Sequence, residues 1–125
     1  MITREEPQPS ELVKLLLEIQ EVFGAVVWRD GAVPIGCWKA EAQDSLAFSL
    51  LAALTGNLEK GIDDLGLGRI NQIWWETEDA QCVGFRAGEW AVLVFAEAAA
   101  NLGKLRTEVA KVLDGNWILL DHIEE

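Results

Sequence analysis

The chain has 125 residues, of which half are apolar and six are tryptophan, and its formal net charge is −11. This length fits one domain that buries roughly two thirds of its unfolded surface, and the composition excludes a disordered chain. The acidic balance argues against nucleic acid as a partner, because phosphate binding needs clustered lysine and arginine, and against anionic membranes.

The cysteines and the apolar runs of the sequence indicate the cellular compartment. Cys37 and Cys82 are too few for a disulfide framework, and we expect both to be buried, inert thiols. No positively charged start precedes an apolar run, and the longest near-apolar run, Leu46 to Leu54, is too short to span a bilayer. We therefore expect no signal peptide, no direct membrane insertion and a cytoplasmic location.

The first 39 residues predict a helix and a hairpin after a flexible N-terminal arm at residues 1–9. Ser10 can cap a helix that runs to about Val22, with an apolar stripe at helical spacing. A short apolar strand at 24–28 follows, and Asp30-Gly31 is a strong hairpin signal. The return strand spans about 34–39, with Pro34 suited to an edge.

The middle of the chain predicts a second helix from Ser45 to about Asp64, capped by Asp44 and ended by the 66–68 segment Gly-Leu-Gly. Three strands at 69–76, 80–86 and 89–96 then form a meander. The third is apolar at every position from Trp90 to Ala96, which is typical of a central strand with cover on both faces.

The last part of the chain predicts a third helix from Asn101 to Asp114-Gly115. The apolar run at 117–120 either adds a short strand or extends this helix. We expect a domain at 10–115, with a tail at 116–125 that packs on it. The element order indicates an α/β (α+β) protein, in which a five-stranded antiparallel sheet forms the middle of a three-layer sandwich.

The second helix carries more apolar residues than one sheet contact needs. One row, Ala47, Leu50, Leu54, Leu58 and Leu65, suits packing on the sheet. A second row, Phe48, Leu51, Thr55, Leu58 and Ile62, has the spacing of a helix–helix seam. Either a loop or the C-terminal tail covers this second row, or a second copy of the helix does.

Trp74 and Trp75 favour the alternative in which a second copy of the helix covers this row. Neighbouring strand residues point to opposite faces, so this strand is apolar on both. No Lys or Pro guards it between Ile70 and Trp75, although bare apolar edges promote aggregation. A homodimer that pairs this strand with its own copy would remove the hazard and set the two helices side by side. The predicted dimer interface consists of Phe48, Leu51, Thr55, Ile62, Ile70, Gln72, Trp74 and Trp75.

Four segments within residues 11–114 together resemble the Roadblock / dynein light chain family, which has a profilin-like fold. They are the opening hairpin at 22–36, the long helix and its exit at 51–68, the strand at 91–95, and the helix start Asn101-Leu102-Gly103-Lys104-Leu105-Arg106. The resemblance implies sheet order 2-1-5-4-3, with one long helix on one face and two on the other. The Trp74 strand is then an edge, and the chain forms a homodimer through joined sheets and adjacent second helices.

The resemblance also implies a function without chemistry. Bacterial members often act with small Ras-like GTPases as activating proteins or scaffolds, and eukaryotic members are adaptors. The family is not known for catalytic residues of its own. The hypothesis it favours is a non-enzymatic homodimeric regulator or scaffold for a small GTPase. The alternatives are a structural adaptor without a GTPase partner and a small-molecule sensor, because tryptophan-rich cores can line pockets.

The residues themselves carry no catalytic set. His122 is the only histidine, so a Ser-His-Asp or Cys-His arrangement would have to use it from the tail. No spacing supports a metal site, and Asn71 stands where a dinucleotide-binding loop would need its third glycine. We therefore predict no enzyme activity, cofactor or metal. An arginine inserted into a GTPase would have to be Arg29, Arg69 or Arg86 at strand ends or turns, and we expect the partner's own catalytic residues to be held in place instead.

Overall fold

A computed structural model describes residues 9–31, 34–38 and 45–123, and only the backbone of residues 9, 10, 38, 45–47 and 115–123. The predicted flexible arm therefore lies almost wholly outside the described residues, as does the Asp44 cap. Eight elements follow one another: α1 Pro9–Leu17, β1 Val22–Arg29, β2 Ile35–Trp38, α2 Ser45–Asp64, β3 Gln72–Glu76, β4 Ala80–Ala87, β5 Trp90–Glu97 and α3 Leu102–Ile123.

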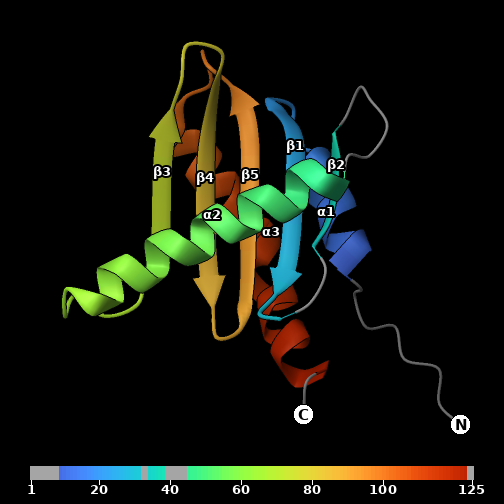
Figure 1. The fold of residues 1–125 in the computed structure, drawn as a ribbon. Coiled ribbons are helices and arrows are strands. Elements are labelled where there is room, and N and C mark those ends of the chain that lie inside the picture. The colour runs from blue at the N-terminus through green and yellow to red at the C-terminus, as the bar shows by residue number, and fades with distance from the viewer. Residues whose placement is uncertain (1–8, 32–33, 39–44, 124–125) are drawn as a thin grey trace, which may run out of the picture.

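The five strands form one antiparallel sheet in the order β2-β1-β5-β4-β3, which confirms the predicted order and places β3 at an edge. The apolar strand β5 is central, as expected from its composition, and only its last residue, Glu97, is exposed. Helix α2 crosses one face of the sheet, and α1 and α3 cover the other (Figure 1). This is the predicted three-layer sandwich.

The two faces of the sheet have separate apolar cores. Between the sheet and α1 and α3, the core includes Leu12, Leu16, Leu105 and Val109 from the helices. Under α2, a smaller core gathers Val26, Trp28, Phe48, Cys82, Ala91, Leu93 and Phe95. Strands β1 and β5 supply side chains to both cores, which explains why they are apolar without alternation.

Local signals place several boundaries where the sequence predicted them. Gly31 and Gly88 take positive φ angles of 82° and 60° in the turns after β1 and β4, where residues with a Cβ would be strained. Asn101 caps α3, since its side-chain oxygen accepts a hydrogen bond of 2.9 Å from the backbone N–H of Lys104. Helix α2 has the predicted limits.

Three boundaries differ from the prediction by three residues or more. Helix α1 ends at Leu17 rather than Val22, because Val22 already pairs with Ala96 of β5 in the sheet. Strand β3 begins at Gln72 rather than residue 69. Helix α3 does not stop at Gly115 but continues to Ile123, so the run at 117–120 extends the helix. A glycine inside a helix costs only about 1 kcal/mol, which the turns on either side of Gly115 offset. How this extension packs on the domain stays a prediction, because its side chains lie outside the described residues.

Candidate interaction surface

The two apolar rows of α2 lie the opposite way round from the prediction. Phe48 is buried under the helix with 1% exposure, and Leu51 packs beside it on the sheet. The row expected on the sheet instead faces outward, with Leu54 64% exposed and Leu50, Leu58 and Leu65 also exposed. The prediction used helical spacing, which groups residues into rows but does not say which row meets the sheet. The aromatic ring of Phe48 decides it, because it fits above Gly36.

Gly36 makes room for that ring. A Cβ added at Gly36 would lie 2.9 Å from the Phe48 ring and 2.9 Å from the carbonyl oxygen of Ala25, closer than real Cβ contacts come. The start of α2 therefore rests directly on β2 and β1. Of the predicted interface residues, Phe48 is unavailable to a partner, and the half-buried side chains of Leu51, Thr55 and Ile62 belong to the inner part of the helix arc. Phe48 and Leu51 pack on the sheet, and the assignment of the α2 residues to a dimer interface stays a prediction.

The strand residues of the predicted interface alternate along the edge. Trp75 is half-buried and packs toward α2 with Ile73, whereas Trp74 is 45% exposed on the face that carries α3. Gln72 lies on the same face as Trp74 and accepts a hydrogen bond from Arg106 of α3. Ile70 is half-buried just before the strand. In the described part of the chain, β3 pairs only with β4, so its outer edge is open.

Gln81 holds the exposed indole in place. Its side chain is 4% exposed, accepts a hydrogen bond of 3.3 Å from the Trp74 indole N–H, and donates to the carbonyls of Ala98 and Ala100 at 3.0 and 2.6 Å. The orientation of Trp74 is therefore set before any partner arrives, which lowers the entropy lost on binding. Sequence reasoning missed this residue, because a polar side chain in a strand normally indicates the solvent face.

A charged cluster fastens the second half of α2 to the sheet. Arg86, at the end of β4, donates from Nε and Nη2 to the two carboxylate oxygens of Glu59 on α2, the second bond at 2.8 Å. It also pairs with Asp30 at 3.1 Å and donates to the carbonyl of Gly88 at 3.2 Å. The Arg86 side chain is only 7% exposed. Burial disfavours its charge, yet the hydrogen bonds and the attraction of Glu59 and Asp30 raise the pKa of Arg86 above its ordinary value.

The sequence predicted neither this cluster nor its burial. Arg86 ends a strand, where charged side chains usually reach water. The available signal was Glu59, which continues the helical row of Phe48, Ala52 and Thr55 and therefore points at the sheet. A carboxylate in a sheet-facing row requires a cationic partner, because an unpaired buried charge is costly.

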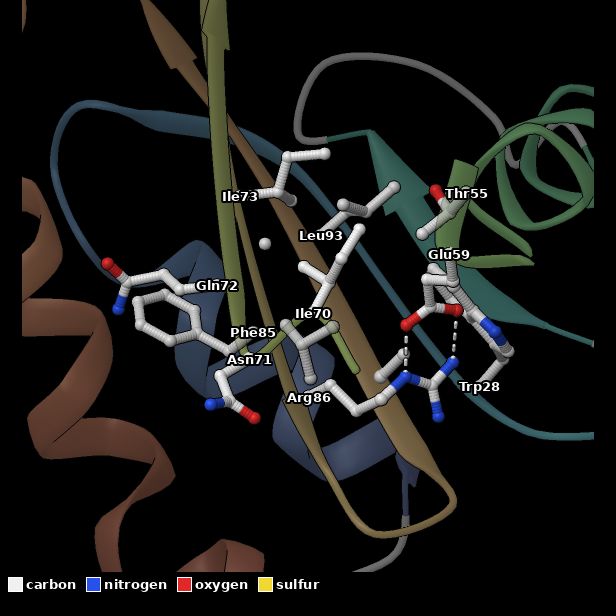
Figure 2. A pocket seen from close by; sticks show the side chains of 13 residues that line it. Trp28, Thr55, Glu59, Ile70, Asn71, Gln72, Ile73, Phe85, Arg86 and Leu93 are labelled. Atoms are coloured by element: carbon white, nitrogen blue, oxygen red, sulfur yellow. Dashed lines mark hydrogen bonds and ion pairs between the residues drawn. The ribbon is translucent and has the colours of Figure 1, made fainter. Parts of the chain in front are cut away.

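A hollow separates the second half of α2 from the sheet (Figure 2). Its cavity volume is only about 20 Å³, and it is lined on the helix side by Thr55 and Glu59, and on the sheet side by Ile73, Leu93 and Arg86 among others. The paired carboxylate and guanidinium occupy one end of it. This volume is far below the range of about 300–1,000 Å³ that is typical of small-molecule pockets, so the hollow does not favour the small-molecule sensor hypothesis.

The remaining chemistry is sparse. Burial raises the pKa of the Cys82 thiol, despite an opposing hydrogen bond with the backbone of Val94, so Cys82 is the inert thiol expected. Cys37 is half-buried and not fully buried as predicted.

Among the described residues, no three His, Cys, Asp or Glu side chains gather closely enough to hold a metal ion. The described helices include none with the length and hydropathy needed to cross a bilayer. The His122 side chain lies outside the described residues.

Comparison with other sequences extends over most of the chain. No protein-family model matches it. Two uncharacterised proteins of Methanocaldococcus jannaschii, MJ0310 and MJ0714, are each 27% identical to it, over 105 and 109 residues. The aligned segments cover 81% and 84% of this chain and 92% of each relative.

Comparison with solved structures decides the fold. Myxococcus xanthus MglB superimposes with a TM-score of 0.77 at 14% identity, over 94% of this chain and 99% of that one. A Roadblock/LC7 domain from Streptomyces avermitilis gives 0.70 at 19% identity, over 91% and 98%. The chain has the Roadblock/LC7 fold. A structure described as MglB with tetrameric arrangement also matches, with a TM-score of 0.70 at 18% identity over 97% and 98%.

The Roadblock/LC7 fold agrees with the resemblance seen in the sequence, including the sheet order and the edge position of β3. At these identities the likeness is one of fold. On the surface of this protein, the exposed leucines of α2 and the open edge of β3 are the features that suit a binding partner.

Proposed function

We propose that the chain is a non-enzymatic homodimeric regulator or scaffold that binds a small Ras-like GTPase and modulates its nucleotide state. The observation that carries the proposal is the exposed leucine row of α2, Leu50, Leu54 and Leu58, in a Roadblock/LC7 fold whose edge strand β3 is open. Contiguous exposed apolar surface on a soluble domain is typical of a protein–protein interface.

The homodimer joins two β3 strands and lays two α2 helices side by side. A twofold axis at the β3 edge makes such a contact isologous, so the same residues meet from both copies. The C-terminal end of α2 projects beyond β3 (Figure 1), over the place where a second sheet would continue. The revised interface is therefore Leu50, Leu54, Leu58, Ile70, Gln72, Trp74 and Trp75, with Thr55 and Ile62 at its inner margin.

Two comparisons support self-association and a GTPase partner. One structural neighbour is an MglB described with a tetrameric arrangement, so a chain of this fold assembles with copies of itself. The family resemblance of the sequence implies a small GTPase as the partner of bacterial members. Regulation would come from holding the catalytic residues of the GTPase in place. Arg86 does not serve as an inserted arginine, because its guanidinium is already bound to Glu59 and Asp30.

Self-association is tested by Leu54→Glu and Trp74→Glu in analytical ultracentrifugation. Each variant places a charge in the proposed joint, and we expect the dimer to weaken about tenfold or more. Ser49→Glu is the matched control, because it adds the same charge to an exposed position of the same helix that lies about 140° around the helix axis from Leu54, and it should leave the dimer intact. A wild-type chain that stays monomeric at high concentration would contradict the homodimer.

The GTPase is tested by capture and turnover. Tagged chain is incubated with lysate of the source organism in GDP or in a slowly hydrolysed GTP analogue, and bound proteins are identified by mass spectrometry. We expect enrichment of a small Ras-like GTPase, and altered GTP turnover when the purified GTPase is mixed with the chain. No enriched GTPase, or neither binding nor altered turnover by the purified protein, would reject the GTPase role and leave the adaptor hypothesis.

A further inference from the structure

Helix α2 is attached to the sheet at two points of different chemistry. Near its start, Phe48 is buried against Gly36, and it is the only buried side chain among α2 residues 48–64. Eleven residues later, about three helical turns, the Glu59 carboxylate is bound by Arg86. The first attachment is apolar and the second is ionic.

Leu51 and Ala52 add apolar packing next to Phe48, in the first half of the helix. Farther along, a small hollow lies between Thr55 and Glu59 on the helix and Ile73 and Leu93 on the sheet. On the sheet side, Gly84 lets the side chains of Ile73 and Leu93 lie close to the backbone of β4, since a Cβ there would lie 2.6 Å from Ile73 and 2.7 Å from Leu93. In the second half of α2, Glu59 is the side chain that is hydrogen-bonded to the sheet, through Arg86.

The ionic contact has a geometry suited to holding an angle. Two parallel hydrogen bonds between a guanidinium and a carboxylate define a plane, whereas a single lysine contact would not. Asp30, from the turn after β1, and the carbonyl of Gly88, from the turn after β4, hold the guanidinium on the sheet side. Arg86 itself is therefore fixed before it meets Glu59.

The residues presented by this half of the helix are the exposed leucines. Leu58 precedes Glu59 directly, and Leu54 lies just over one turn before it. We propose that Arg86 is a positioning residue for self-association: through Glu59 it clamps α2 at the crossing angle that presents Leu54 and Leu58 to a second copy of this chain. The inference rests on the homodimer proposed above.

The test compares Arg86→Met, Glu59→Leu and the double variant Glu59→Leu/Arg86→Met. In either single variant, one charge loses its main partner, and we expect faster amide hydrogen exchange in residues 58–64 and a dimer weakened about three- to thirtyfold. The double variant leaves neither a Glu59 nor an Arg86 charge unpaired, but it also lacks the paired hydrogen bonds that hold the helix angle. We therefore expect its exchange and association to stay as altered as in the single variants. Association within about twofold of wild type would show that the unpaired charge caused the loss, and it would overturn the inference.

Matched controls separate positioning from loss of fold. Arg69→Met removes the same charge from an exposed side chain that reaches Asp30 only at 3.9 Å, and it should change neither exchange in α2 nor association. Slow exchange in β1 and β5 reports that the sheet remains folded. If Arg86→Met fails to fold, Arg86→Lys replaces it, and the single-point contact of lysine should give an intermediate loss.

The outcomes distinguish this inference from the homodimer itself. A dimeric wild type whose Arg86→Met variant, or Arg86→Lys in its place, associates as tightly as before overturns the clamp alone. A dimer weakened equally by Arg69→Met also overturns it, because the effect is then one of net charge. A monomeric wild type overturns the homodimer and with it the link between the clamp and association.

Discussion

The two faces of the sheet are covered in different ways by the same chain. Helices α1 and α3 bury Leu12, Leu16, Leu105 and Val109 against one face. On the other face, α2 buries Phe48 and leaves leucines outside. Apart from Trp74 at the β3 edge, the first face is covered by folding alone, whereas the second retains a row of exposed leucines that folding does not use. Apolar residues of one helix can therefore have two roles, since some pack on the sheet and others are available to bind a partner.

The cause lies in how much of each helix is apolar. Helix α3 has a narrow stripe, which a single sheet contact can cover. Helix α2 has an apolar arc too wide for one sheet, so part of it must face solvent or another chain. The same sheet thus carries a self-sufficient side and a side suited to assembly.

The largest difference between the two faces should appear in unfolding. We expect Leu105→Ala to lower the free energy of unfolding of the dilute monomer by about 2–5 kcal/mol, because it opens a cavity in the α1/α3 core. Leu54→Ala should change it by less than about 0.5 kcal/mol, since the side chain is already in water. Urea unfolding at low protein concentration measures both. Equal losses would mean that Leu54 is buried in the monomer and that the contrast between the faces is false.

An intermediate effect is expected where α2 touches the sheet. Gly36→Ala brings a Cβ within 2.9 Å of a backbone oxygen, which cannot move aside as a side chain can, and we expect a loss of about 1–3 kcal/mol. Gly56→Ala is the matched control on the solvent side of α2, where nothing lies within 4 Å. It should stabilise the helix by up to about 1 kcal/mol. Thermal unfolding compares the two, and a tolerated Gly36→Ala would show that Phe48 can shift without loss.

The smallest effect concerns Cys82 under α2. Burial raises the pKa of the Cys82 thiol in the folded chain, whereas the thiol of an unfolded chain has a pKa of about 8.5. As the pH rises, the unfolded chain therefore loses this proton before the folded chain does. The contribution to stability is complete below that pH and falls by up to about 1.4 kcal/mol for each pH unit above it. Comparing wild type with Cys82→Ala between about pH 8 and about pH 9, where the loss stays below about 1 kcal/mol, isolates it. Parallel stability curves for the two proteins would contradict the buried, neutral thiol.

Sequence reasoning predicted the elements better than their orientation. Helix α2 begins and ends where its caps and glycines indicated, and β5 is central because every residue from Trp90 to Ala96 is apolar. The predicted ends of α1 and α3 differ from those in the structure for two reasons. Val22 fits a helical stripe and a strand equally well, and Gly115, a typical helix end, lies inside α3. When a residue suits both a helix and a strand, strand pairing and tertiary packing decide which of the two it adopts.

The candidate surface divides along the same line. Its location on α2 and β3 followed from an excess of apolar residues, but which leucines face outward depended on the fit of the Phe48 ring over Gly36. The Gln81 support of Trp74 and the Arg86–Glu59 contact join residues far apart in the chain, and no local pattern announces them.

The amino-acid sequence alone determined the order and type of the elements, the central position of β5 and the presence of more apolar surface on α2 than one sheet can cover. These follow from spacing and composition, which are local properties of the chain. Only the tertiary structure decided which row of α2 meets water and which charge holds it. Those outcomes depend on which side chains from β1, β2 and β4 meet the helix, and that meeting exists only once the sheet has formed.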